Sequence, residues 1–78
     1  MIEVKFFGAI AEQTKCVNEI VATEAVLLSE LLYDLKTKYR LDAFVFQIAV
    51  NQKIVTEPSK LVLQTNDVVA LLPPFAGG

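Results

Sequence analysis

Apolar and polar side chains alternate along residues 2–8, which have the sequence IEVKFFG. In an extended chain, one face would carry three apolar side chains, those of Ile2, Val4 and Phe6. The opposite face would carry Glu3, Lys5 and Phe7. A period of two residues is typical of a half-buried strand. We therefore predict a first strand that buries its Ile2 face and leaves Phe7 outside the core.

The next two segments predict the second strand of a hairpin. Residues 9–15, AIAEQTK, interrupt the alternation, and we interpret them as a loop. Residues 16–22, CVNEIVA, restore a composition that is typical of a strand. Together the two strands favour a hairpin with a rather long connection.

An amphipathic helix is predicted near residues 27–40. Large side chains recur there at spacings of three and four residues, at Leu28, Leu31, Leu32, Leu35 and Tyr39. This period places them on one face of about three helical turns. The start of the helix is poorly marked, because Thr23 is too early for a cap and Ser29 lies inside the pattern.

The second half of the chain favours a short hairpin and a final strand. Residues 47–50, QIAV, and residues 53–55, KIV, flank the dipeptide Asn51–Gln52. Asparagine suits a turn because its side chain bonds locally and tolerates unusual backbone angles. We interpret residues 56–66 as loop and short turn, and residues 67–72, DVVALL, as a buried strand.

This order of elements predicts the α+β class, with one main helix on one face of a mixed sheet. The first and last strands are the most apolar, so we place them in the middle of the sheet. The order suits a β-grasp, or ubiquitin-like, sheet. A ferredoxin-like sheet would need a second helix, and the pattern shows none. We expect one domain in residues 1–72 and an extended tail in residues 73–78.

Composition and charge disfavour several classes of function. With 54% hydrophobic and 21% charged residues, this 78-residue chain suits a packed core rather than disorder. Its net charge of −2 and scattered basic residues disfavour nucleic-acid binding. No apolar run approaches the roughly 20 residues that cross a bilayer. We therefore expect a cytoplasmic protein that binds neither nucleic acid nor membrane.

The sequence offers little chemistry inside the domain. It contains no histidine, which is the commonest general base and metal ligand. Cys16 is the only cysteine, so an internal disulfide and a multi-cysteine metal site are excluded. We interpret Cys16 as a small strand residue beside the turn, and we expect no metal site. The carboxylates show no paired spacing, and we interpret them as solvated surface charge, including Glu12, Glu19, Glu24 and Asp67. A stand-alone enzyme is therefore disfavoured.

The segment VVALLPPFAGG contains the strongest candidate for function. Pro73 and Pro74 lack an N–H donor and hold the residue before each of them extended, so the chain leaves the last strand in a stiff direction. Residues 73–78 can reach roughly 20 Å at about 3.3 Å each. Gly77 and Gly78 have no Cβ, so a partner's backbone can approach them closely. The alternative is a frayed end, but fraying needs neither a double proline nor the large side chain of Phe75.

Strand alternation also predicts an apolar patch on the face opposite the helix. If Val69 and Leu71 point inward, Leu72 points outward and lies beside Phe7. Ile54, after the hairpin turn, would complete the patch near the base of the tail. Exposed apolar clusters of this kind usually mark interfaces. The alternative is that one of these residues belongs to the core, because a slip of one residue exchanges the two faces.

Four segments, in this order, resemble the small subunit of molybdopterin synthase, a sulfur-carrier family with a β-grasp fold: KFFGAIAE, LSELLYDLKTKY, AVNQKIV and NDVVALLPPFAGG. The last segment is the most specific, because other double-glycine carriers, such as the thiamine sulfur carrier, generally lack the Pro-Pro step. The chain departs from the family pattern at Asn66, where glycine is frequent, and at Leu27, where serine or threonine usually caps the helix.

The resemblance implies that Gly78 is the reacting residue. An adenylating, E1-like partner would activate its carboxyl group with Mg-ATP, and a sulfur donor would convert it to a thiocarboxylate. The remaining tail residues would thread into a partner: Pro73, Pro74, Phe75, Ala76 and Gly77. Within a heterotetramer, the large subunit would supply the catalytic side chains that build the dithiolene of molybdopterin.

The resemblance also implies that this chain binds no cofactor itself. Phe7, Ile54 and Leu72 match the family's interface residues by position. The alternatives are a sulfur carrier of the thiamine pathway and a ubiquitin-like protein modifier.

Overall fold

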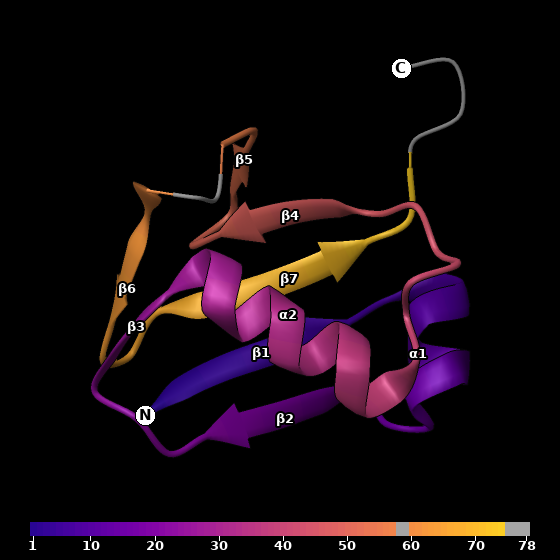
Figure 1. Cartoon of the computed structure of the whole chain (residues 1–78), viewed down its shortest axis with the longest axis horizontal. Helices are drawn as coiled ribbons and strands as arrows, with labels where there is room; N and C mark the ends of the chain where they lie inside the picture. The colour runs from indigo at the N-terminus through magenta and orange to yellow at the C-terminus, as the bar shows by residue number, and fades with distance from the viewer. Residues whose placement is uncertain (58–59, 75–78) are drawn as a thin grey trace.

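The computed structural model describes residues 1–57 and 60–74, and its main element is a five-stranded sheet (Figure 1). The strands are β1 Ile2–Phe6, β2 Asn18–Val21, β4 Gln47–Val50, β5 Lys53–Val55 and β7 Val68–Leu72. Their order across the sheet is β2-β1-β7-β4-β5. β1 and β7 run parallel, whereas the other neighbours are antiparallel. The predicted mixed sheet, with the first and last strands as inner neighbours, is confirmed.

The long helix α2, Leu28–Tyr39, crosses one face of this sheet (Figure 1). Its four leucines are buried, and its bounds lie within one residue of the predicted helix at each end. Leu27 precedes it with extended backbone and no side-chain cap, and Arg40 ends it in a left-handed conformation. Because the start is uncapped, the helix depends mainly on burial of its leucine face.

β1 and β7 separate a buried face from an outer face, by which we mean the sheet face opposite α2. The side chains that point toward α2 are at most 2% exposed: Ile2, Val4, Phe6, Val69 and Leu71. The register pairs Val4 with Val69 and Phe6 with Leu71. Side chains of the outer face are exposed or half-buried: Glu3, Lys5, Phe7, Val68, Ala70 and Leu72. The predicted faces of both strands are therefore confirmed.

Our interpretation of residues 9–15 as a loop is wrong, because a second helix, α1, spans Gly8–Thr14. It starts at Gly8, whose φ of +59° few other residues adopt, and it buries Ile10 in the core. Lys15 ends it in a left-handed conformation and donates a backbone hydrogen bond to Ala11. One buried isoleucine in seven residues gives too weak a period to reveal a helix in the sequence. The helix missing from the prediction does not change the sheet, whose single parallel pair is that of the expected β-grasp.

A small second sheet lies at one end of α2 (Figure 1). It pairs β3, Ala25–Leu27, with β6, Val62–Gln64, in antiparallel register. The interpretation of residues 56–66 as loop is therefore wrong for β6. Leu63 of β6 is fully buried in the core, and the Leu28 N–H donates to the Leu61 carbonyl oxygen over 2.9 Å. A three-residue strand is too short for alternation to mark it.

The predicted turns are confirmed by their backbone angles. Asn51 and Gln52 have φ values of 50° and 71°, and Asn66 has a φ of 73°. Within residues 1–57 and 60–74, neither helix has the length and apolar character needed to cross a membrane.

Candidate functional site

Four strands contribute one straight row of side chains to the outer face. The register pairs Lys5 with Ala70, Ala70 with Ala49, and Ala49 with Ile54. Directly paired residues point to the same side of a sheet, so the row runs from β1 to β5. The two alanine side chains are small, so the middle of the row is lower than its ends. One end carries the amine of Lys5, and the other carries the Ile54 side chain, which is 52% exposed.

Phe7 and Leu72 lie together at the end of β7. The Phe7 N–H donates to the Leu71 carbonyl oxygen over 3.2 Å, which completes the parallel pairing of Phe6 with Leu71. Phe7 is 43% exposed and Leu72 is half-buried, so both present apolar surface on the outer face. Ile54 is on the same face, but it is in row with Ala70, so it lies two strands and two residues away from Leu72, or about 12 Å at the usual strand spacing and rise.

A groove of about 390 Å³ extends along the outer face beside Phe7. Its lining residues are Lys5, Phe7, Asn51, Gln52, Val68 and Ala70. Lys5 forms no ion pair with any other residue in the described ranges. The groove therefore combines an aromatic wall, an apolar floor and one available cation.

Asp67 fixes the polar end of this groove. Its carboxylate accepts hydrogen bonds from the Gln64 N–H over 2.8 Å and from the Asn51 amide over 3.1 Å. These two bonds, the backbone one first, lower the pKa of Asp67 below its ordinary value. The Asn51 side-chain oxygen also accepts from the Val68 N–H over 3.0 Å. These bonds hold the β4–β5 turn against the start of β7. Asp67 therefore has a structural role and is not merely a solvated charge.

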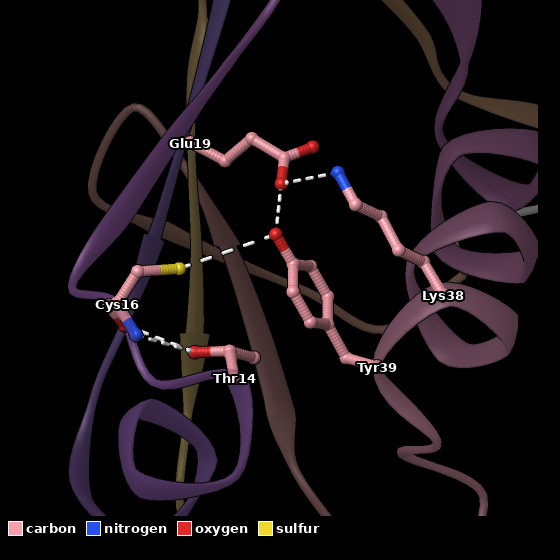
Figure 2. Close-up of polar contacts among 5 residues, drawn as sticks. All are labelled: Thr14, Cys16, Glu19, Lys38 and Tyr39. Carbon is pink, nitrogen blue, oxygen red and sulfur yellow. Dashed lines mark hydrogen bonds and ion pairs between the residues drawn. The ribbon is translucent and has the colours of Figure 1, made fainter.

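A second polar cluster lies on the α2 side of the sheet (Figure 2). Glu19 of β2 accepts hydrogen bonds from the Tyr39 hydroxyl and, over 2.9 Å, from the Lys38 ammonium. The Cys16 thiol approaches the Tyr39 oxygen at 4.0 Å. The Tyr39 ring packs edge-on against Phe6, with ring centres 5.5 Å apart. Our interpretation of Glu19 as solvated charge is wrong, because its carboxylate joins the edge strand to the end of α2.

This cluster shifts the pKa values of its members in opposite directions. Partial burial acts to raise the pKa of Glu19, but the hydrogen bonds from Tyr39 and Lys38 outweigh burial and lower it. The hydrogen bond to Glu19, followed by burial, raises the pKa of Tyr39 to about 12. Both shifts favour the carboxylate with a protonated tyrosine, which is an arrangement for stability. The sheet separates it from the groove.

The structure brings together some of the predicted site residues but not all of them. Phe7, Leu72 and Pro73 are neighbours, and Ile54 shares their face at a distance. Pro73 is half-buried and packs on Gly8, whereas Pro74 is exposed. The predictions for Phe75, Ala76, Gly77 and Gly78 fall outside the described residues.

Sequence reasoning missed Lys5, Asn51 and Gln52 as groove residues. β4 runs antiparallel to β7, with Val50 paired to Val69, so the β4–β5 turn is carried to the start of β7. That pairing is a long-range relationship without a local signal in the sequence. Alternation does place Lys5 on the same face as Phe7, and this was the one available clue.

A mixed sheet of order β2-β1-β7-β4-β5, with β1 parallel to β7 and one long helix across one face, defines a domain of the ubiquitin-like β-grasp class. The chain belongs to the ThiS family, whose model matches residues 4–78. No curated protein matches its sequence.

One solved structure supports this assignment. A chain in the complex of subunits 1 and 2 of the molybdopterin-converting factor from Helicobacter pylori 26695 is 35% identical, with a TM-score of 0.70. That similarity covers 99% of this chain and 97% of the other.

Two more distant structures show the shared fold alone. A Pyrococcus furiosus protein assigned as molybdopterin-converting factor subunit 1 is 23% identical, with a TM-score of 0.81, over 95% of this chain and 97% of that one. The small archaeal modifier protein 1 of Methanosarcina acetivorans is 22% identical, with a TM-score of 0.79, over 99% and 95%.

Proposed function

We propose that this chain is the sulfur-carrying small subunit of a molybdopterin synthase. One observation carries the proposal: the exposed Phe7 is hydrogen-bonded through its N–H to the Leu71 carbonyl oxygen, so it lies at the end of β7, on the same face as Leu72 and just before Pro73. An exposed apolar side chain therefore lies next to the Pro73–Pro74 step, which precedes the Gly77–Gly78 pair in the sequence. Membership of the ThiS family and the likeness to the Helicobacter pylori complex support this proposal.

The proposed chemistry takes place at the carboxyl group of Gly78. A carboxylate oxygen attacks the α-phosphorus of Mg-ATP in an adenylating partner, and pyrophosphate leaves. A donor then delivers sulfur at the oxidation level of sulfide, which attacks the acyl carbon and displaces AMP. The product is a Gly78 thiocarboxylate, and this chain supplies no catalytic side chain.

The outer face would hold the partners while the tail enters their active sites. Phe7 and Leu72 provide the apolar contact nearest the tail, and Ile54 adds a contact two strands away. Lys5 in the groove suits a partner that presents a carboxylate at this point. The large subunit would then consume the sulfur in forming the dithiolene of molybdopterin.

A sulfur carrier of the thiamine pathway is the second candidate, because the matching family model is that of ThiS. The Pro73–Pro74 step favours the first candidate. Both share the chemistry at Gly78 and differ only in the protein that consumes the sulfur.

The test is to incubate the full chain with an adenylating enzyme, Mg-ATP and a sulfide source, and to weigh the intact protein. We expect the mass gain for one oxygen replaced by sulfur, and no gain in a chain that lacks Gly78. Loss of molybdoenzyme activity in cells carrying the deletion would support the molybdenum pathway over the thiamine pathway. A ladder of conjugates on other proteins, without any thiocarboxylate, would instead indicate a protein modifier.

A further inference from the structure

Gly8 and Pro73 make a close contact between the start of α1 and the residue that follows β7. A Cβ placed on Gly8 would lie 3.2 Å from Cγ of Pro73 and 3.7 Å from its Cβ and Cδ. The first of these separations is tighter than ordinary packing, so any side chain at position 8 would press on the proline ring. With a side chain at position 8, the ring would have to shift by a few tenths of an ångström.

The backbone on both sides of this contact is held by hydrogen bonds. The Phe7 N–H donates to the Leu71 carbonyl oxygen over 3.2 Å, two residues before Pro73. The Phe7 carbonyl oxygen accepts from the N–H groups of Ile10 and Ala11 over 3.2 and 3.4 Å. Gly8 therefore lies between a fixed strand end and the first turn of α1, and it has little freedom to move away from Pro73.

Proline has a rigid ring and a fixed φ, so the position of its ring determines where the following residue begins. We propose that Gly8 is a positioning residue: its bare backbone and the start of α1 form a seat for the Pro73 ring, which sets the direction in which the chain leaves β7. The importance of this direction for activity rests on the proposed function, since the tail must carry Gly78 into a partner's active site.

Gly8 also has a purely local role, which must be separated from the proposed one. Its φ of +59° strains any residue that has a side chain, wherever Pro73 lies. The Pro73→Ala substitution removes Cγ and Cδ and leaves only the Cβ at 3.7 Å, which is an ordinary contact. The backbone strain of Gly8→Ala is the same whether residue 73 is proline or alanine. Its contact with the proline ring exists only when Pro73 is present.

The first experiment needs no partner. In solution NMR of the full chain, we expect a nuclear Overhauser contact between the Gly8 α-protons and the Pro73 ring. In Gly8→Ala, the dipolar couplings of the Pro73 and Pro74 Cα–Hα bonds should change, while those of β1 and β7 stay constant. An absent contact in the wild-type protein, or unchanged proline couplings in the variant, overturns the seat.

The second experiment measures loading with an adenylating enzyme, Mg-ATP and sodium sulfide, well below the unfolding temperature. We expect Gly8→Ala to lower kcat for thiocarboxylate formation about 10-fold or more, because small misplacements of reacting groups are costly. The Kd for the adenylating enzyme should not change, since the outer face is intact. In the Pro73→Ala background, the same substitution should have little further effect.

Equal losses in the two backgrounds, or a weakened Kd in place of a lower kcat, overturn the positioning role. If Gly8→Ala does not fold, the wild-type nuclear Overhauser contact between Gly8 and the Pro73 ring decides, and its absence overturns the seat. If the wild-type chain gains no sulfur, the proposed function fails, while the NMR experiment still tests the seat.

Discussion

The backbone N–H of Phe7 donates a hydrogen bond to the carbonyl oxygen of Leu71 over 3.2 Å. This bond is the last between β1 and β7 before the chain reaches Pro73, which has no N–H to continue the ladder. It fixes an exposed aromatic ring at the point where the strand ends and the tail begins.

Replacing Phe7 by alanine should weaken the proposed complex with a large subunit about 10-fold or more, because a buried aromatic side chain at an interface can contribute over 1 kcal/mol. The free energy of unfolding should change by about 1 kcal/mol or less, since the ring lies outside the core. Titration calorimetry measures the first quantity and urea unfolding the second.

Tyr33→Ala is the matched control, because Tyr33 is an aromatic residue on α2 that is 71% exposed and lies away from the outer face. It should leave the affinity unchanged. Equal affinities for the Phe7 variant and the wild-type protein would show that the outer face is not the docking surface.

Ile54→Ala should reduce the same affinity by less than Phe7→Ala does. Ile54 shares the outer face but lies two strands from Leu72, toward the edge of the patch, where contacts contribute less than those at the centre. Val62→Ala is the control, since Val62 is an exposed β-branched residue of the small sheet. A larger loss at Ile54 than at Phe7 would move the centre of the interface to β5.

Leu71→Ala should lower the free energy of unfolding by about 2–5 kcal/mol, because it empties a fully buried site in the core. Leu72→Ala should cost far less, since the next side chain along β7 faces outward. Urea unfolding of both variants compares the two faces of one strand. A reversed order would mean that β7 is shifted by one residue.

Tyr39→Phe should remove an alkaline dependence of stability. The pKa of Tyr39 is raised from 10.0 to about 12 on folding, so the folded state holds this proton more tightly than the unfolded state. The resulting stabilisation is complete below pH 10 and is lost as the pH rises toward 12. The difference in unfolding free energy between the wild-type protein and Tyr39→Phe should therefore shrink across this range.

Glu19→Gln is the companion variant for the pH experiment. It removes the carboxylate whose hydrogen bond is the first cause of the Tyr39 shift, so the alkaline loss should still begin near pH 10 but should be smaller and finish at lower pH. Tyr33→Phe should leave the profile of the wild-type protein unchanged. If Tyr39→Phe and the wild-type protein gave parallel profiles, the bond to Glu19 would not hold the proton.

The main sheet and the long helix could be predicted because the spacing of apolar residues in each of these elements follows which side chains are buried. Alternation in β1 separated Ile2 from Phe7, and the leucine spacing located α2 to within one residue. The same reasoning placed Phe7 and Leu72 on one face, where the structure has them. These features depend on contacts that repeat regularly along the sequence.

The missed features depend on contacts without such a period. α1 buries Ile10 but has only seven residues, and β6 is marked by little more than the buried Leu63. Glu19 misled us because β2 points this acid toward α2 and exposes Ile20, the reverse of the usual pattern. Tyr39 and Lys38 make that position favourable, and they come from a different element.

The place of β7 in the sheet has a consequence for how the chain acquires its structure. β7 follows the other described strands in the sequence, yet it lies between β1 and β4. During synthesis β1 therefore cannot form its parallel pairing until β7 has been made. Pairings between such distant segments form slowly and leave apolar edges open in the meantime. Until β7 has been synthesised, β1 and β4 therefore lack the strand that lies between them.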